Sequence, residues 1–525
     1  MARVLVTEKI AQRGLDRLAA AGHEVDVQEG LDPAALLEAV VGAHALIIRS
    51  ATKVTAEVLE AGRDLQVVGR AGVGLDNVDV PAATSHGVMV VNAPTSNILS
   101  VAEQAMGLLL AQARNIPQAH AALVAGRWER SKWEGVELHG KVLGVVGLGR
   151  AGSLVAQRAL AFGMRLLAFD PYISAERARA MGVELRSIEE LFAESDFISI
   201  HTPKTPETAG LVGRDLLAKA KPGIRIVNTA RGGIIDEEAL AEAIRDGVVA
   251  GAALDVFATE PPGDSPLLAL ESVVVTPHLG ASTEEAQDKA GLTIAEQVEL
   301  ALAGEFVPYA VNVAATEVSE AVRPFMALAE QLGQIFASLH EGLPERLEIE
   351  YQGELAAAAT GILTLSVLKG LFATTTEEPV SYVNAPQLAA DRGLEVRETS
   401  TATSPNYKSL VSLRSATHAV AATLTGAGVR TEPRLVMVDD HTIEVPPSPH
   451  MLVVRNDDRP GMIGVVGMVL GDAGVSISSM AVGPSRQPGA GTALMVLALS
   501  EPAPDDVLAR LRADEGIVDL HRVSL

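Results

Sequence analysis

The stretch Val142–Gly152, VLGVVGLGRAG, constrains the fold of this 525-residue chain more than any other feature. An apolar, β-branched run leads into three glycines with the spacing G-x-G-x-x-G, and a helical pattern follows. A strand, a glycine turn and a helix in this order are typical of a dinucleotide-binding βαβ unit in a parallel sheet. Because a lone G-x-G-x-x-G also occurs in ordinary turns, the flanking strand and helix are what favour a cofactor site.

The three glycines have separate roles in such a turn. Gly147 permits the tight turn, Gly149 lets the backbone approach a pyrophosphate, and Gly152 lets the helix pack closely on the strand. The helix begins at Arg150 and Ala151, and the unpaired N–H groups of its first turn favour phosphates. We therefore predict that these five residues contact a dinucleotide.

The strand that follows this helix, RLLAFD, ends at Asp170, about twenty residues after the first glycine. A carboxylate at this place accepts hydrogen bonds from the ribose hydroxyls and repels a 2′-phosphate. Pro171 and Tyr172 come next, so no basic residue offsets the repulsion there. The sequence therefore predicts NAD rather than NADP as the cofactor.

Composition excludes several other classes of function. The chain has 42 basic and 66 acidic residues, and its formal net charge of -24 repels nucleic-acid phosphates and anionic lipids. It has no cysteine, which excludes disulfides, thiol catalysis and thiolate metal sites and fits a reducing compartment. The N-terminus lacks a signal-peptide pattern, and no apolar run approaches the ~20 residues that span a bilayer. We expect a cytoplasmic protein that binds no nucleic acid, membrane or metal ion.

Short strand-like runs alternate with helical segments over residues 3–94, and again between the strand that precedes the glycine turn and VVVTPH. This alternation is typical of parallel sheets with crossover helices. A long helical segment, 100–115, separates the two runs, and a helix over 291–304 closes the second. We therefore predict two doubly wound α/β domains.

The pattern changes from about residue 312 onward. Residues 345–451 contain strand-like pieces without a recognisable catalytic spacing, and PPSP at 446–449 predicts a linker. From Met451 the strands and helices follow the order of a ferredoxin-like βαββαβ domain. The chain is thus expected to end in two smaller α+β domains.

Three segments of the second run carry a candidate active site. NTARGGIIDEEAL, LDVFATEPP and VVTPHLGAST contain Arg231, Glu260 and His278, and each follows an apolar strand, where open α/β sheets place ligands. Alcohol oxidation requires a base, which His278 would supply while Glu260 orients its ring and stabilises its protonated form. Arg231 would bind a substrate carboxylate bidentately. Taken alone, each residue also fits a turn, a solvated loop or a strand end; together they predict hydride-transfer chemistry.

These segments, in this order and after the glycine turn, resemble the D-2-hydroxyacid dehydrogenase family over roughly residues 1–310. The tail from Met451, with NDDRPGMIGVVGMVLGDAGVSI as its most specific part, resembles an ACT domain. The resemblance implies two Rossmann-like domains, the first discontinuous, followed by an intervening domain and the ACT domain. The implied bounds are 1–97 with 284–311 for substrate binding, 98–283 for NAD binding, 312–448 for the intervening domain and 449–525 for the ACT domain.

The resemblance also implies two further sets of site residues. The cofactor set at the strand ends comprises His201, Thr202, Pro203, Thr229, Ala230, Asp255 and Gly280. The substrate set comprises Arg49, Ser50, Gly72, Val73, Gly74 and Asn97, with Arg130 contributed across a dimer interface. Within the substrate set, the glycine-rich turn resembles a backbone cradle for the substrate carboxylate, and the two arginines suit a phosphate.

The order of the extra domains resembles a branch of the family that oxidises 3-phosphoglycerate to 3-phosphohydroxypyruvate, the first step of serine biosynthesis. Without these domains, a hydroxypyruvate or glyoxylate reductase would compete equally. An NADH-sensing binding protein is a further alternative, which the intact Arg231, Glu260 and His278 disfavour. Members of the family are oligomeric, so a homodimer or homotetramer is expected.

The tail departs from the pattern of relatives that L-serine regulates. Asn456, Asp458 and Ser476 stand at the positions that the resemblance gives to an effector site. Serine-regulated relatives typically carry asparagine in place of Ser476, and a shorter side chain there would weaken contact with the effector's charged groups. We expect a domain that dimerises, with serine feedback weak or absent.

Overall fold

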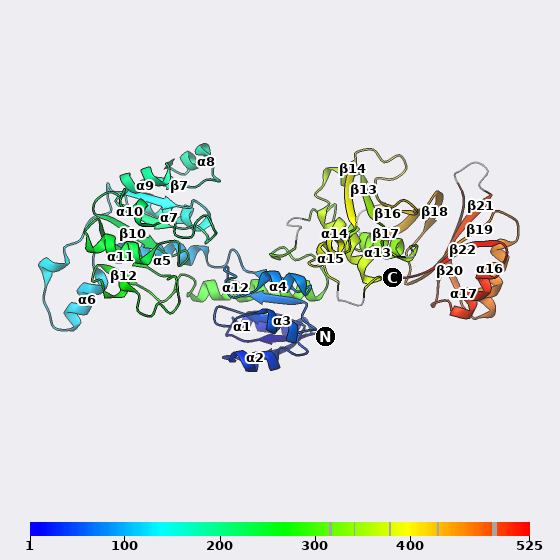
Figure 1. The fold of residues 1–525 in the computed structure, drawn as a ribbon, viewed down its shortest axis with the longest axis horizontal. Helices are drawn as coiled ribbons and strands as arrows, with labels where there is room; N and C mark the ends of the chain where they lie inside the picture. The colour runs from blue at the N-terminus through cyan, green and yellow to red at the C-terminus, as the bar shows by residue number, and fades with distance from the viewer. Residues whose placement is uncertain (314–317, 341, 377–379, 428–429, 486–490) are drawn as a thin grey trace.

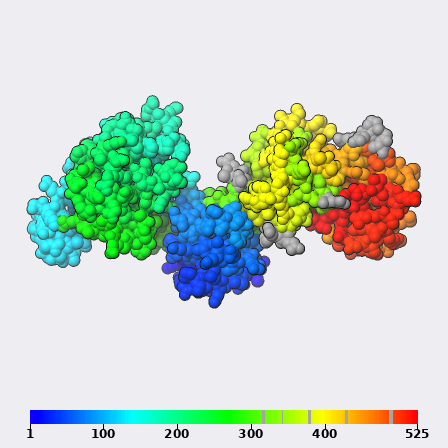
Figure 2. Space-filling model, viewed as in Figure 1, coloured from blue at the N-terminus to red at the C-terminus, as the bar shows by residue number. Residues whose placement is uncertain are grey.

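The computed structural model describes residues 1–313, 318–340, 342–376, 380–427, 430–485 and 491–525. Its strands form four sheets, one in each of four domains along the chain. Figure 1 shows the first domain (blue) between the second (cyan to green) and the third (yellow), with the fourth (red) beyond it. The four domains remain distinct lobes in the space-filling view (Figure 2). The predicted fold class is confirmed; the exact domain bounds remain a prediction.

The first domain is a five-stranded parallel sheet with the strand order β2-β1-β3-β4-β5. Its elements are β1 (Arg3–Val6), α1 (Gln12–Ala20), β2 (Glu24–Val27), α2 (Pro33–Ala39), β3 (Ala45–Ile48), α3 (Ala56–Ala61), β4 (Val67–Arg70), α4 (Val80–Ser85), β5 (Met89–Asn92) and the returning α12 (Glu284–Leu302). Alternate strand residues pack on α1 and α12 on one face and on α2, α3 and α4 on the other. Burial on both faces explains why the strands are almost wholly apolar.

Helix α12 makes this domain discontinuous in the sequence, as expected. It packs so closely on α1 that a Cβ atom on Gly14 would lie 2.7 Å from the carbonyl oxygen of Gly291. Arg17 of α1 forms ion pairs with Glu296 and Glu299 of α12, at 3.1 and 2.8 Å. The chain therefore leaves the first domain after β5 and returns to it almost two hundred residues later.

The second domain is a seven-stranded parallel sheet with the order β12-β11-β10-β9-β6-β7-β8. Its elements are α5 (Ile98–Ala113), α6 (Ile116–Val124), η1 (Arg130–Trp133), β6 (Val142–Val146), α7 (Arg150–Ala161), β7 (Arg165–Phe169), α8 (Ala175–Ala180), β8 (Val183–Leu185), α9 (Ile188–Glu194), β9 (Phe197–Ile200), α10 (Arg214–Leu217), β10 (Ile224–Asn228), α11 (Glu237–Arg245), β11 (Val249–Leu254), η2 (Pro266–Ala269) and β12 (Val273–Val275). The strand order reverses between β6 and β9, and ligands of open α/β sheets bind at such a switch point.

Two chain crossings connect the first and second domains, one before α5 and one before α12. The Ser100 and Thr283 hydroxyls, which lie at these two crossings, are 2.8 Å apart and form a hydrogen bond. Because both crossings lie side by side, they can serve as one hinge between the domains.

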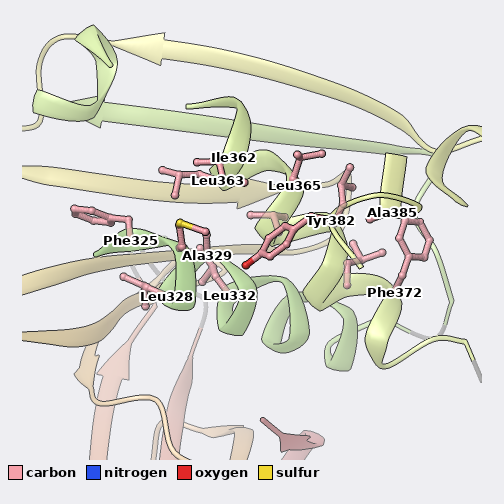
Figure 3. Packing of buried hydrophobic residues seen from close by; sticks show 14 of the residues in the cluster. Phe325, Leu328, Ala329, Leu332, Ile362, Leu363, Leu365, Phe372, Tyr382 and Ala385 are labelled. Carbon is pink, nitrogen blue, oxygen red and sulfur yellow. The ribbon is translucent and has the colours of Figure 1, made fainter. Parts of the chain in front are cut away.

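The third domain has a six-stranded mixed sheet with the order β14-β13-β15-β16-β17-β18. Its elements are α13 (Phe325–Ser338), β13 (Arg346–Gly353), η3 (Glu354–Ala357), α14 (Gly361–Ala373), α15 (Ala385–Asp391), β14 (Glu395–Thr401), β15 (Ser409–Arg414), β16 (Ala419–Ala427), β17 (Arg430–Val438) and β18 (His441–Val445). Figure 3 shows its core, where apolar side chains of α13 face those of α14. Gly333 and Gly370 allow the close contact, since a Cβ atom on either would lie within 2.2 Å of a backbone oxygen.

The fourth domain has the predicted βαββαβ order and an antiparallel sheet, β20-β21-β19-β22. Its elements are β19 (His450–Asp457), α16 (Met462–Asp472), β20 (Ile477–Pro484), β21 (Thr492–Leu499), α17 (Asp505–Arg512) and β22 (Ile517–Ser524). The expected linker, PPSP, lies between β18 and β19. Across the described parts of the chain, no helix is both long and apolar enough to pass through a membrane.

Candidate active site

A cavity of about 690 Å³ lies between the first and second domains. Its walls are the carboxyl ends of β1, β3 and β4, the turn before α5, the loops that follow β11 and β12, and the start of α12. The carboxyl ends of parallel strands are where open α/β sheets place ligands. The cavity therefore lies where the fold itself predicts a site.

His278 and Glu260 form a hydrogen-bonded pair in the cavity wall. The imidazole Nδ1 is 2.7 Å from Glu260 Oε2, and Glu260 Oε1 accepts a hydrogen bond of 3.1 Å from the backbone N–H of Phe257. When Nδ1 carries the proton toward this carboxylate, Nε2 is the basic nitrogen that can accept a proton from a substrate. The pair therefore has the geometry of a base and its orienting acid.

The backbone around His278 is held in an unusual conformation. His278 has a φ of 55°, in the left-handed region that non-glycine residues rarely adopt. The buried carboxylate of Asp255 accepts hydrogen bonds from the N–H groups of Leu279, at 2.7 Å, and Gly280, at 2.8 Å. The N–H of His278 itself donates to the backbone carbonyl of Asp255. Asp255 thus fixes the loop that carries the proposed base.

Arg231 connects the two domains at the glycine-rich turn, and it is not among the residues that line the cavity. It follows β10 in the second domain, and its Nε is 3.4 Å from a carboxylate oxygen of Asp76 in the first. Its guanidinium fills the space beside Gly74, where an added Cβ atom would lie 2.4 Å from Nη2. A side chain at Gly74 would therefore displace the end of Arg231 from this turn.

The structure brings most of the predicted substrate residues together. Arg49, Ser50, Gly72 and Asn97 line the cavity, while Val73 and Gly74 continue the same turn. Arg130 does not join them, because it lies in η1, beyond α6 in the second domain (Figure 1 labels α6). Its prediction depended on a second subunit and stays a prediction.

The glycine turn has the close contacts that its spacing predicts. Gly147 has a φ of 90° and follows β6, and a Cβ atom on Gly152 would lie 2.0 Å from the Gly147 carbonyl oxygen. Gly149 caps α7, whose first residues are Arg150 and Ala151, and a Cβ atom on it would meet nothing within 4 Å. The turn is thus tight at its first and third glycines and open at the second, where a pyrophosphate would approach.

The remaining cofactor residues surround this turn at the switch point. Asp170 follows β7 and accepts a hydrogen bond of 2.8 Å from the N–H of Leu148. His201, Thr202 and Pro203 follow β9, and Thr229 and Ala230 follow β10. The Thr229 hydroxyl and the His201 Nδ1 atom are shielded from solvent without a hydrogen-bond partner in the described structure. The open space at the second glycine leaves room for a dinucleotide, and the two unpaired polar atoms are free to contact it. The residues at this switch point therefore suit NAD.

Comparison with known proteins identifies the domains. Residues 106–280 match the family described as D-isomer specific 2-hydroxyacid dehydrogenase, NAD binding domain. Residues 321–439 match the D-3-phosphoglycerate dehydrogenase intervening domain, and 450–516 match the ACT domain. D-3-phosphoglycerate dehydrogenase of Mycobacterium leprae is 49% identical over 99% of both chains, and that of Methanocaldococcus jannaschii is 43% identical over all of both. The chain belongs to the D-3-phosphoglycerate dehydrogenase family.

Solved structures that match this family member include two whose whole length corresponds to 59% of its chain. The TT0316 protein of Thermus thermophilus is 39% identical, with a TM-score of 0.55, and covers 59% of this chain and 99% of its own. D-Lactate dehydrogenase of Escherichia coli is 31% identical, with a TM-score of 0.54, and covers 59% of this chain and all of its own. The body is therefore shared with other D-2-hydroxyacid dehydrogenases, and the two C-terminal domains carry the narrower resemblance.

Two cations of the cavity wall, Lys9 and Arg70, were not predicted from the sequence. Lys9 follows β1 and Arg70 ends β4, and both line the cavity together with Arg49. Glu260 is the acidic residue among those that line it. Burial, and then the nearby charge of Arg231, lower the pKa of Arg70, although an arginine at this depth stays charged. Its Nε is shielded from solvent and has no hydrogen-bond partner in the described structure. A charged residue at the end of an apolar strand, VVGR, was the signal that could have found it.

The three predicted effector residues do not meet within one ACT domain. Asn456, in β19, is paired with Ala493 near the start of β21, whereas Ile477, next to Ser476, is paired with Leu499 at its end. Six residues of strand separate the two positions, a span of about 20 Å. Asp458 is exposed in the turn before α16. An effector site made of these residues would need a second copy of the domain, and the prediction stays a prediction.

His201 gives a pH-dependence that can be measured. Burial of the ring lowers its pKa from 6.5 to about 4, so the folded protein keeps His201 neutral where the unfolded chain protonates it. Its stabilising contribution is complete above pH 6.5 and is lost as the pH falls toward 4. His201→Phe removes this group, so unfolding should take up fewer protons in this window, by up to about one. The slope of the free energy of unfolding against pH should then fall by up to about 1.4 kcal/mol per pH unit. Urea unfolding at several pH values measures it; equal slopes would contradict it.

Proposed function

We propose that this protein catalyses the NAD-dependent oxidation of 3-phosphoglycerate to 3-phosphohydroxypyruvate, the first step of serine biosynthesis. The observation that carries the proposal is one cavity with the His278–Glu260 pair and three cations, Lys9, Arg49 and Arg70. The protein carries a net charge of -24, so a positively charged wall is a local exception that suits a substrate with two anionic groups, a carboxylate and a phosphate.

Each group in the cavity has a role in this reaction. Nε2 of His278 accepts the proton of the substrate's 2-hydroxyl, and Glu260 stabilises the imidazolium that forms. Arg231 and the N–H groups of the glycine-rich turn bind the substrate carboxylate. Bound NAD, held by the glycine turn, Asp170 and the strand-end residues that follow β9 and β10, supplies the hydride acceptor. Lys9, Arg49 and Arg70 bind the phosphate, which fixes the substrate carbon near the base.

An alternative is a reductase for hydroxypyruvate or glyoxylate, which carry no phosphate. Such a substrate would leave the three cations of the cavity wall without a phosphate to bind, and burial makes an unpaired charge costly at Arg70. An NADH-sensing binding protein would not need the His278–Glu260 pair. The phosphate contact therefore separates these functions.

Arg49→Met tests the phosphate contact. We expect the KM for 3-phosphoglycerate to rise about ten- to a hundredfold, because a charge-assisted hydrogen bond contributes about 1.5–3 kcal/mol. The change for phosphate-free D-glycerate should be small. NADH formation at alkaline pH measures both substrates, and Arg63→Met, at an exposed arginine of the same domain, is the matched control. Wild-type protein that does not oxidise 3-phosphoglycerate would refute the proposed function.

We also propose that the protein is a homodimer or homotetramer in the cytoplasm. The placement of Arg130 outside its own cavity supports an assembly in which the partner subunit supplies this residue. The separation of Asn456 and Ser476 in one ACT domain supports an effector site between two copies. Light scattering of the purified protein measures the assembly, and a monomer would contradict it.

L-Serine is expected to be a weak effector, because the short side chain of Ser476 offers less to the effector's charged groups than an asparagine would. Millimolar L-serine should leave the initial rate of the wild-type enzyme nearly unchanged. Ser476→Asn should increase the inhibition, since its amide both donates and accepts hydrogen bonds. Initial rates over a serine titration measure this, and strong inhibition of the wild type would exclude it.

A further inference from the structure

The segment Arg49–Thr52, which follows β3, presents Arg49 and Ser50 to the cavity without belonging to a helix or strand. A loop of this kind loses substantial conformational entropy when it is held in one conformation. Something must therefore hold its backbone if the guanidinium is to meet a phosphate with precision.

The carboxylate of Glu8, just after β1, accepts hydrogen bonds from three backbone N–H groups of this segment. Oε1 is 2.8 Å from the nitrogen of Arg49 and 2.9 Å from that of Thr52, and Oε2 is 3.1 Å from that of Ala51. Burial alone would raise the pKa of Glu8, but these N–H donors outweigh it and hold the pKa below its usual value. The carboxylate thus stays charged while it is enclosed by the segment's own amides.

Asn77 holds the same segment from its carbonyl side. Its Nδ2 donates to the carbonyl oxygens of Arg49, at 2.8 Å, and Thr52, at 2.6 Å. Asn77 belongs to the AGVGLDNVD stretch, whose glycine-rich turn is part of the proposed carboxylate cradle. The segment is therefore fixed between the end of β1 and the turn that is expected to bind the other end of the substrate.

We propose that Glu8 and Asn77 are positioning residues for substrate binding: they clamp the backbone of residues 49–52 so that Arg49 and Ser50 meet the phosphate. Neither side chain touches the substrate in this scheme. This inference rests on the proposed function, and it adds that the accuracy of phosphate binding is set by two residues outside the contact set. It also connects the phosphate-binding and carboxylate-binding ends of the cavity through Asn77.

Glu8→Gln tests the clamp, because the amide keeps the size of the side chain but replaces one acceptor oxygen with a donor that opposes the backbone N–H groups. We expect the KM for 3-phosphoglycerate to rise about tenfold, with kcat and the KM for NAD almost unchanged. Asn77→Ala should raise the same KM. Asp32→Asn is the matched control, since Asp32 also accepts a backbone N–H, that of Ala35, but caps α2 outside the cavity wall. Its KM should equal that of the wild type.

A double-mutant cycle separates positioning from general stability. If Glu8 acts through Arg49, Glu8→Gln adds little to the KM of the Arg49→Met variant, whereas a merely structural effect would multiply with it. The proposal would be overturned if the two substitutions multiplied their effects on the KM or if Glu8→Gln left the KM unchanged. It would also be overturned if Glu8→Gln weakened the use of phosphate-free D-glycerate as much as that of 3-phosphoglycerate. Should Glu8→Gln fail to fold, Asn77→Ala carries the same cycle.

Amide hydrogen exchange gives a readout that does not depend on turnover. The N–H groups of Arg49, Ala51 and Thr52 should exchange slowly in the wild type and faster in Glu8→Gln, while those of β3 stay protected. If the wild type fails to oxidise 3-phosphoglycerate but shows this protection pattern, the proposed function fails and the clamp stands. Equal exchange in both proteins overturns the clamp itself.

Discussion

Replacing His278 by alanine is expected to lower kcat by roughly a hundred- to ten-thousandfold, the usual contribution of a general base. We expect the loss because Nε2 of His278 is the atom proposed to accept the hydroxyl proton, and alanine leaves nothing in its place. The KM for NAD should change little, since the glycine turn proposed to hold the cofactor follows β6, and β9, β10 and β11 separate β6 from β12, the strand before His278. Steady-state rates of NADH formation at alkaline pH measure both quantities.

Two further variants serve as comparisons for His278→Ala. Glu260→Gln should lose less activity than His278→Ala, because the base remains while the carboxylate that stabilises its protonated form, 2.7 Å away, is gone. His86→Ala changes an exposed histidine at the end of α4 and should leave the rate at the wild-type value. A His278→Ala enzyme with more than about a tenth of the wild-type kcat would exclude His278 as the base.

Gly152→Ala is expected to destabilise the protein and to abolish tight NADH binding. A Cβ atom at this position would lie 2.0 Å from the carbonyl oxygen of Gly147, so α7 has to move away from β6. Overpacking of this kind costs about 1–3 kcal/mol, which lowers Tm by several degrees. Because the first turn of α7 is then displaced, the N–H groups expected to face the pyrophosphate are displaced with it.

Gly149→Ala is the control that separates packing from cofactor contact. Its Cβ atom meets nothing within 4 Å in the structure, so Tm should remain at the wild-type value. NADH binding should still weaken, since the methyl group occupies the space that the pyrophosphate needs. Thermal unfolding and NADH fluorescence titration measure the two effects. Wild-type NADH affinity in Gly152→Ala would contradict the predicted role of the third glycine.

The sequence was most informative where a function requires a local pattern. The glycines at 147, 149 and 152 and the strand before them are contiguous, so their spacing alone predicts the turn that the structure shows. The same holds for the strand ends that carry Glu260 and His278, because apolar strands in an α/β protein place the residues that follow them at one edge of the sheet.

The sequence was least informative for residues whose role depends on strands that are far apart in the chain. Lys9 and Arg70 became part of the cavity wall only because β1 and β4 end at the same edge of the first sheet. Glu8 looks like any polar residue after a strand, and its three N–H partners lie more than forty residues away. Asp255 was predicted to contact NAD, a prediction that stays open, and its bonds to the 278–280 loop had no sequence signal.

The sequence by itself determined the order of four domains and the glycine turn, and it identified the candidates for a base, an acid and a carboxylate-binding arginine. These depend on residues close together in the chain or on motifs whose context is local. The tertiary structure alone decided that three cations share one cavity wall, and that Asn456 and Ser476 lie beside opposite ends of β21. The physical reason is that strand order and register set which chain ends meet, and neither is encoded by any single segment.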